Sequence, residues 1–233
     1  MQKPKMILFD AGKTLLNYQN VDTLCGVRAY CAYMTANPRN LSTEEIDTRV
    51  NAIFETFEDC RKNLFEVHEQ MILKLAFDLL ELKFSISIPE IERIIWENAS
   101  DIVPVVGAEE LLSYLNTAGI RTGVISNLDF SGSLLESRLN QIYPHNQFEF
   151  VIASSDYGIR KPNPYLFQTG IQKACLSPEE IWYIGDKEKV DVRGAQCCGM
   201  TPVLYKSEFN HYASLPNDIL VIDHYNQLID HLQ

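Results

Sequence analysis

The feature that most constrains this chain is a short apolar run, Met6–Phe9, which stops abruptly at an aspartate. Four apolar residues are too few for a buried helix of ordinary length, so the run is typical of a strand buried in a parallel sheet. Asp10 follows the run directly, and Gly12 allows the backbone to turn tightly and to point N–H groups at a ligand. The stretch therefore predicts a strand that presents the Asp10 carboxylate at a sheet edge. Asp10 could equally cap the following turn, and these residues alone favour neither role.

The residues Gly12–Thr14 also match the end of a nucleotide-binding phosphate loop. Such a loop needs another glycine five residues before Gly12. Ile7 occupies that position, inside the expected strand. We therefore exclude a phosphate loop.

The chain has 233 residues, of which 46% are hydrophobic and 22% charged, and its formal net charge at pH 7 is −11. This composition is that of an ordinary globular protein with a sizeable core. The negative charge argues against nucleic acid or an anionic membrane as a partner, because neither would be attracted. An anionic substrate would need local attraction from backbone amides, a helix N-terminus, a metal ion or a lysine.

The six cysteines show neither the spacing of a zinc site nor that of a redox pair. We expect free thiols in a reducing compartment. The apolar run near the start is too short for a signal peptide or a membrane span. A cytoplasmic protein is therefore expected, as a monomer or a homodimer.

Residues 17–102 show helical periodicity and no plausible long strand. Ser42 and Glu45 form a capping-box pair, Pro89 is placed to open a later helix, and a further helix is expected before Pro38. One apolar stripe at helical spacing consists of Ile46, Val50, Ile53, Phe54 and Phe57, and a second consists of Val67, Met71, Leu75, Leu79 and Leu82. A bundle of about four helices is predicted here.

From residue 103 onward, helices and strands alternate, which is typical of a parallel sheet with crossover helices. One helix should stop at Gly119, Asn163 and Pro164 should start another, and a third should run from Asp186 to Gly199. The expected strands are Arg121–Ser126, Phe148–Ala153, Ile181–Ile184, Thr201–Leu204 and Ile219–Ile222. The chain is thus predicted to be an α/β protein whose three-layer core (residues 1–16 and 103–233) carries an inserted α-helical bundle (residues 17–102).

Polar side chains gather where the expected strands end. In an open parallel sheet, the carboxyl ends of neighbouring strands converge on one crevice. The residues at or just beyond these ends are Asp10, Ser126, Asn127, Lys161, Asp186 and Asp191. Magnesium-assisted phosphoryl transfer needs such a set, because the metal takes hard oxygens, a lysine balances charge, and a hydroxyl and amides hold phosphoryl oxygens. Each residue alone also has an ordinary structural role, such as helix capping by Ser126 or a solvated Lys161.

Taken together and in order, four segments resemble the four motifs of the haloacid dehalogenase-like (HAD) hydrolases. They are FDAGKTL (9–15), VISN (124–127), RKPNP (160–164) and IGDKEKVD (184–191). The resemblance spans essentially the whole chain, and the helical insert resembles the cap of the subclass whose cap follows the first motif. It implies a Rossmann-like core with a helical cap and a hydrolase activity.

The resemblance also implies roles for individual residues. Asp10 would be the nucleophile, forming an aspartyl-phosphate that water then hydrolyses. Lys161 and Ser126 would hold the transferring group, and the remaining phosphate-binding residues would be Ala11, Gly12, Thr14 and Asn127. Magnesium would be held by Asp10, the backbone carbonyl of Gly12 and Asp186, with Asp191 behind them. Most members act on small phosphorylated metabolites, so such a substrate is expected.

The sequence departs from the family at Gly12, where its phosphatases carry a second aspartate as the general acid and base. Proton transfer of this kind contributes about 10² to 10⁴ in rate. Two alternatives therefore stay open, a phosphate-binding or regulatory protein that turns over slowly, and non-ester chemistry like that of the family's phosphonoacetaldehyde hydrolases, which recruit a cap lysine. Lys62, Lys74 and Lys83 lie in the expected cap, but their spacing favours solvated side chains. Glu188 is close enough in sequence to supply a proton, although a solvated glutamate is the more ordinary role.

Overall fold

The computed structural model describes residues 3–207 and 219–233, and a six-stranded sheet lies at its centre. The strand order is β10-β9-β8-β1-β6-β7, and every neighbouring pair is parallel. The strands are β1 (Met6–Phe9), β6 (Arg121–Ser126), β7 (Phe148–Ala153), β8 (Ile181–Gly185), β9 (Thr201–Tyr205) and β10 (Leu220–Ile222). The prediction of a parallel α/β sheet is confirmed, with strand ends correct to within one residue.

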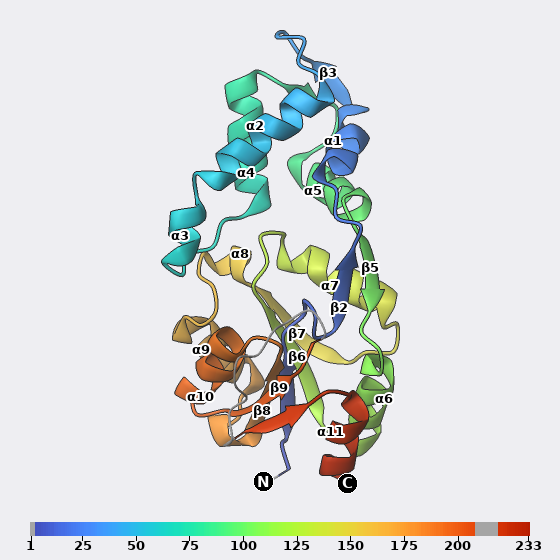
Figure 1. Ribbon diagram of the computed structural model, residues 1–233, viewed down its shortest axis with the longest axis vertical. Helices are drawn as coiled ribbons and strands as arrows, with labels where there is room; N and C mark the ends of the chain where they lie inside the picture. The colour runs from blue at the N-terminus through green and yellow to red at the C-terminus, as the bar shows by residue number, and fades with distance from the viewer. Residues whose placement is uncertain (1–2, 208–218) are drawn as a thin grey trace.

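Helices cover both faces of this sheet and give the predicted three layers (Figure 1). Because side chains alternate along a strand, Ile7 and Phe9 of β1 face one core, whereas Met6 and Leu8 face the other. The first core is covered by α6 (Ala108–Ala118), α7 (Gly132–Ile142) and α11 (Tyr225–Leu232). The second is covered by α9 (Pro164–Ala174) and α10 (Arg193–Cys197). A short helix, α8 (Ser154–Tyr157), follows β7, and the 3₁₀ turn η1 (Pro178–Glu180) precedes β8.

The inserted segment forms a helical bundle with its own apolar core, at the opposite end of the long axis from the sheet (Figure 1). Its helices are α1 (Thr23–Cys31), α2 (Thr43–Glu55), α3 (Glu58–Lys62), α4 (Glu69–Leu80) and α5 (Ile88–Asn98). Capping boxes start α2 at Ser42 and α5 at Ser87. The predicted bundle is thus present, as four longer helices and the short α3.

The second apolar stripe predicted for this segment, which lies on helix α4, is wrong. On α4, Met71, Leu75 and Leu79 are 46%, 39% and 54% exposed, while the buried side chains are Ile72, Leu73, Ala76, Phe77 and Leu80. Val67 and Leu82 are buried but lie outside the helix. Because α4 is apolar around most of its circumference, a spacing of three and four residues fits two faces, and tertiary packing selects one.

The inserted segment is also not wholly helical. Strand β2 (Leu16–Gln19) pairs antiparallel with β5 (Asp101–Pro104), and β3 (Met34–Ala36) pairs antiparallel with β4 (Lys83–Phe84). The two chain crossings between sheet and bundle therefore run side by side as a ribbon (Figure 1). We propose that this ribbon is the junction between a core domain (1–16 and 103–233) and a cap domain (17–102).

After β8 the chain forms a π-helical turn, η2 (Glu188–Val192), before α10, instead of one helix from Asp186 to Gly199. The Lys187 carbonyl accepts from the N–H groups of both Asp191 and Val192. π-turns of this kind are frequent at functional sites. Within the described residues, no helix is long and apolar enough to cross a membrane.

Candidate active site

Three parallel neighbours, β1, β6 and β8, bring their carboxyl ends to one edge of the sheet. Asp10 follows β1, Ser126 is the last residue of β6, and Asp186 follows β8. The Asp10 N–H donates to the Ile184 carbonyl at 2.8 Å, which continues the pairing of β1 with β8 beyond the strands. This local geometry fixes the position of the Asp10 carboxylate.

The carboxylates of Asp10, Asp186 and Asp191 are buried, and one oxygen from each lies within 4.8 Å of the other two. Asp191 reaches this cluster because η2 packs against the end of β8. A Cβ on Gly185 would stand 2.4 Å from the Asp191 Cγ, so any larger residue there would displace the carboxylate. The Lys187 N–H donates to Asp191 Oδ2 at 3.0 Å and holds it in place.

The buried Lys161 ammonium lies between two of these carboxylates. Its Nζ is 2.7 Å from Asp10 Oδ1, 2.7 Å from Asp191 Oδ1 and 2.7 Å from the Tyr183 hydroxyl. A lysine ammonium has three N–H donors, and these acceptors match all of them. Burial alone would lower the pKa of Lys161, but Asp10 and Asp191 outweigh burial and raise it well above its ordinary value. The lysine is therefore a fixed positive charge.

Burial also acts on Asp10, whose pKa it raises above the ordinary value. Lys161 opposes this rise, while the neighbouring Asp191 carboxylate adds to it. Three carboxylates thus gather around one buried ammonium, and a cation among them would be attracted.

Asn127 fixes the backbone at Lys161. Its side-chain oxygen accepts from the Lys161 N–H at 2.7 Å, and its amide nitrogen donates to the Lys161 carbonyl at 2.9 Å. The sequence identified Asn127 as a phosphate-binding residue. The structure shows this amide positioning the lysine.

The turn after β1 supplies the remaining predicted residues. The Ala11 carbonyl accepts from the N–H groups of Leu15 and Leu16 at 2.8 and 2.9 Å. Thr14 is buried, and its carbonyl accepts a hydrogen bond from the Tyr225 hydroxyl. A Cβ at Gly12 would meet only the Tyr18 ring, at 3.6 Å, which is an ordinary contact distance. A Cβ therefore fits at position 12.

The residues predicted from the strand ends are thus brought together, but two tyrosines were missed. Tyr183 binds Lys161 and also donates to the Ile125 carbonyl at 2.9 Å. A hydroxyl in the middle of a fully buried strand must find polar partners, and this signal could have identified it. Tyr18 lies against Gly12 from β2, a strand that the sequence analysis did not predict.

The donor set fits magnesium, because carboxylate and carbonyl oxygens are its preferred ligands. Asp10 and Asp186 contribute carboxylates, and Gly12 retains a backbone carbonyl. Both oxygens of Asp191 already accept hydrogen bonds, from Lys161 and from the Lys187 N–H. Asp191 is therefore better placed to support the ligands than to be one.

The alternative proton donors are three lysines of the helical bundle segment and Glu188. Lys62 and Lys74 are 71% and 67% exposed and pair with neighbouring carboxylates on their own helices, and Lys83 is exposed. Glu188 forms an ion pair with Arg193 at 3.3 Å. The solvated roles expected for these lysines are confirmed.

Known proteins resemble this chain in sequence over most of its length. A family model described as haloacid dehalogenase-like hydrolase matches residues 7–204. A glyceraldehyde 3-phosphate phosphatase of Pyrococcus furiosus is 25% identical over 219 residues, which cover 92% of this chain and 85% of that protein. The haloacid dehalogenase-like hydrolase domain-containing protein 3 of Mus musculus is 34% identical over 94 residues, 40% of this chain, and the match spans only 36% of its own length.

Solved structures show the same fold. The crystal structure of a HAD phosphatase from Thermococcus onnurineus has a TM-score of 0.64 at 19% identity, and the match covers 99% of this chain and 98% of that one. The likeness therefore extends over sheet and bundle together.

Proposed function

The chain belongs to the haloacid dehalogenase-like hydrolases, and from this premise we propose that it is a magnesium-dependent phosphatase acting on a small phosphorylated metabolite. The observation that carries the proposal is the buried Lys161 ammonium, 2.7 Å from both Asp10 and Asp191, beside the Asp186 carboxylate. A fixed cation beside a buried carboxylate suits the attack of an anion on a phosphoryl group. Relatives named as phosphatases support this reaction over dehalogenation.

In the proposed reaction, an Asp10 carboxylate oxygen attacks phosphorus, and the bond from phosphorus to the leaving oxygen breaks. The leaving oxygen takes a proton from solvent, and an aspartyl-phosphate remains on Asp10. Water then attacks this phosphorus, which releases inorganic phosphate and restores the carboxylate. Lys161 balances the negative charge throughout, and Ser126, Thr14 and the backbone N–H groups after Asp10 hold the phosphoryl oxygens.

Asp10, the Gly12 carbonyl and Asp186 would hold magnesium, with Asp191 behind them. The bound ion would supply positive charge to the phosphoryl oxygens. Six free thiols fit a reducing compartment, and we propose a cytoplasmic protein without nucleic-acid or membrane partners.

Gly12 favours a second candidate, a phosphate-binding or regulatory protein that turns over slowly. The chain has no carboxylate at the position from which family phosphatases protonate the leaving group. Phosphonatase-like chemistry has less support, because the three lysines of residues 17–102 lie in solvent.

A panel of phosphomonoesters, acyl phosphates and phosphonates, assayed with and without magnesium, separates these functions. The phosphatase proposal expects magnesium-dependent release of phosphate from esters. It also expects beryllium fluoride to leave a mass-spectrometric adduct on Asp10. Binding of phosphate without turnover of any ester would favour the regulatory protein, and turnover of phosphonates alone would favour non-ester chemistry.

A further inference from the structure

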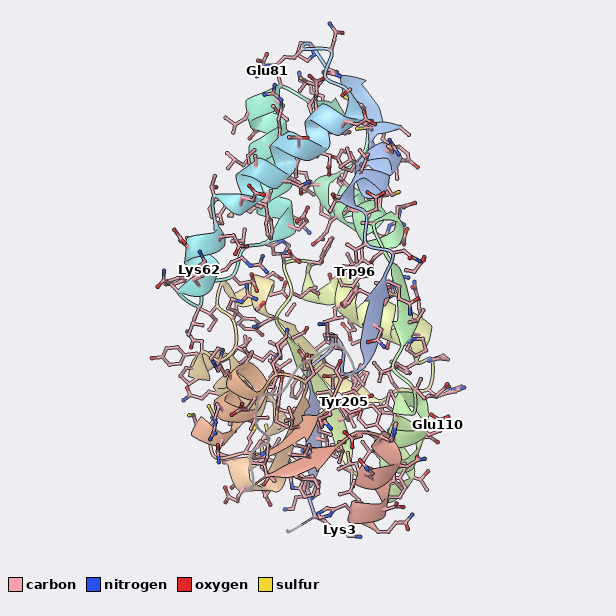
Figure 2. All side chains as sticks on the ribbon, viewed as in Figure 1. Lys3, Lys62, Glu81, Trp96, Glu110 and Tyr205 are labelled. Carbon is pink, nitrogen blue, oxygen red and sulfur yellow. The ribbon has the colours of Figure 1, made fainter. Side chains whose placement is uncertain are left out.

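A cavity of about 360 Å³ lies between the helical bundle and the carboxyl edge of the sheet. The bundle contributes apolar residues from α1, α2, α4 and α5, and the sheet side contributes Tyr18 and the segment Leu128–Phe130. Figure 2 shows Trp96, one of the lining residues, between the two parts of the molecule. Cavities of this size and apolar character are typical of small-molecule sites.

The cavity adjoins the proposed nucleophile. The Tyr18 ring, which lines it, stands 3.6 Å from the position of a Cβ on Gly12, two residues after Asp10. Burial raises the pKa of Tyr18 well above its ordinary value, and the negative charges of Asp10 and Asp129 add to this rise. Leu128, two residues after Ser126, also lines the cavity. A leaving group that extends from Asp10 past the Tyr18 ring would enter this space.

The charged residues that line the cavity are all acidic. They are Asp47, Glu69 and Asp129, and its described lining contains no lysine, arginine or histidine. Burial raises the pKa of Glu69 to about 8, with Asp129 and Glu92 adding to the effect. The two arginines whose charges act on Asp129, Arg61 and Arg160, are both paired with Glu66 at 3.3 Å. A second anionic group on a substrate would find no counter-ion here.

Two buried lining residues carry polar atoms that lack a partner. Tyr30 is 0% and Trp96 3% exposed, and within the described chain neither the Tyr30 hydroxyl nor the Trp96 Nε1 has a hydrogen-bond partner. A buried polar group without a partner destabilises the folded protein. A ligand hydroxyl could accept from the Trp96 N–H, and a hydroxyl or ammonium could donate to the Tyr30 oxygen, which a purely apolar ligand could not do.

We propose that this cavity selects phosphomonoesters whose leaving group is apolar, carries an ammonium or hydroxyl group and has no second anionic group, with Glu69 and Asp129 as the specificity-determining residues. The proposal rests on the phosphatase function and adds the substrate class to it. The apolar walls take the body of the leaving group. The carboxyl groups accept hydrogen bonds from its polar end, and in their ionised form they repel anions.

The test uses three aryl phosphates that differ only in the para substituent: aminoethyl, methyl and carboxymethyl. At about pH 9, above the pKa of about 8 to which burial raises Glu69, we expect kcat/KM with magnesium to be about tenfold or more higher for the aminoethyl than for the carboxymethyl ester, because like charges near a carboxylate are strongly disfavoured. The ratio should fall in Glu69→Gln and in Asp129→Asn and approach unity in the double variant. Asp78→Asn, an exposed carboxylate on the same helix as Glu69, should leave the ratio unchanged.

The ratio of kcat/KM for the aminoethyl ester to that for the carboxymethyl ester is the decisive readout, because a merely structural defect lowers turnover of all three esters together. An equal or reversed preference in the wild type, or a ratio unchanged in the double variant, would overturn the proposal. If none of the esters is hydrolysed, the phosphatase function fails and the cavity is tested by calorimetric binding of tyramine and of 4-hydroxyphenylacetate. Tighter binding of tyramine would then support the assigned ligand class, and equal or weaker binding would overturn it.

Discussion

At the scale of single residues, Lys161 determines the geometry of the site. Burying an ammonium ion costs several kcal/mol unless its partners satisfy it fully. Asp10, Asp191 and Tyr183 do so, each at 2.7 Å. The same contacts orient the Asp10 carboxylate before any substrate arrives. Catalytic groups fixed in this way do not need to be reorganised during the reaction.

Asp10→Asn should abolish hydrolysis while leaving the binding of phosphate analogues largely intact. An asparagine amide has nearly the shape of the carboxylate and can still accept a hydrogen bond from Lys161, but it is not a nucleophile. Steady-state rates and calorimetric titration with vanadate measure the two properties separately. Wild-type activity in Asp10→Asn, or an adduct on another residue, would refute the role of Asp10.

Gly12→Asp tests whether a missing proton donor limits the enzyme. The backbone at Gly12 is not left-handed, and a Cβ there meets Tyr18 at an ordinary 3.6 Å, so the variant should fold. We expect turnover of alkyl phosphates to rise by no more than about 10² to 10⁴, the range of positioned acid–base catalysis. Aryl phosphates should gain less, because their leaving anions need little protonation.

The matched measurement is the ratio of variant to wild-type rates on one alkyl and one aryl phosphate at fixed magnesium. Ratios at or below unity on both, in a variant that still binds magnesium, would contradict the idea of a lost acid. The carboxylate would then act mainly through bulk and through repulsion of Asp10.

Much of the site could be predicted because the carboxyl ends of parallel strands meet at one edge of the sheet, however the side chains pack. Asp10, Ser126, Lys161, Asp186 and Asp191 follow from that rule. The positioning role of Asn127 could not, because it depends on which backbone groups the loop at Lys161 turns toward it. Tyr18 was missed for a related reason, since β2 is formed only by pairing with β5, some eighty residues later in the chain.

At the scale of elements, a buried ion network fastens the bundle to the loop that carries Lys161. The Glu66 carboxylate is fully buried, accepts from the Ser154 hydroxyl at 2.7 Å, and pairs with Arg61 and Arg160 at 3.3 Å each. Beside it, the Glu66 N–H donates to the Gly158 carbonyl at 3.0 Å. Because Arg160 directly precedes Lys161, this contact couples the position of the bundle to that of the lysine.

Glu66→Gln should lower the free energy of unfolding by about 2 kcal/mol, since two half-buried arginines lose their bonds to a buried carboxylate. It should also reduce kcat, because the loop at Lys161 loses an anchor. Glu58→Gln is the matched control, as Glu58 pairs with the same Arg61 at 3.3 Å but is 49% exposed. Urea unfolding that gives equal stability for the two variants would contradict this role of Glu66.

Whether an element could be predicted depends on how many structures its sequence pattern fits. Strands β6 and β7 were predicted with correct ends, because each is a β-forming run bounded by turn residues. The face of α4 was predicted wrongly, because Met71, Leu75 and Leu79 fit a helical stripe as well as the buried residues do. Only the neighbouring helices decide which stripe is covered.

At the scale of the whole molecule, the core of the bundle and one of the two cores of the sheet are separate clusters, and Phe130 packs against both. Phe130 lies next to Asp129 in the segment that lines the cavity. The bundle and the sheet therefore meet through the β2–β5 ribbon, the Glu66 network and this shared aromatic residue. Events at the sheet edge should consequently affect the stability of the whole chain.

Magnesium should therefore raise the thermal stability of the protein. A ligand that binds only the folded state stabilises it by about 2.7 kcal/mol at a hundred times its dissociation constant. For a chain of this length, each kcal/mol shifts Tm by about 2–4 °C, so a saturating concentration should raise Tm by about 5–10 °C. Calorimetric scans with and without magnesium, followed by addition of a chelator, measure this shift and its reversal.

Asp186→Asn should remove most of the shift, because the ion would lose one of its carboxylate ligands. Without magnesium, the same variant should be at least as stable as the wild type, since three carboxylates lie within 4.8 Å of one another and repulsion among them is relieved. Asp78→Asn, which removes an exposed carboxylate far from the sheet edge, should keep the full shift. An equal magnesium shift in Asp186→Asn and the wild type would show that the ion binds elsewhere and would refute the assigned metal site.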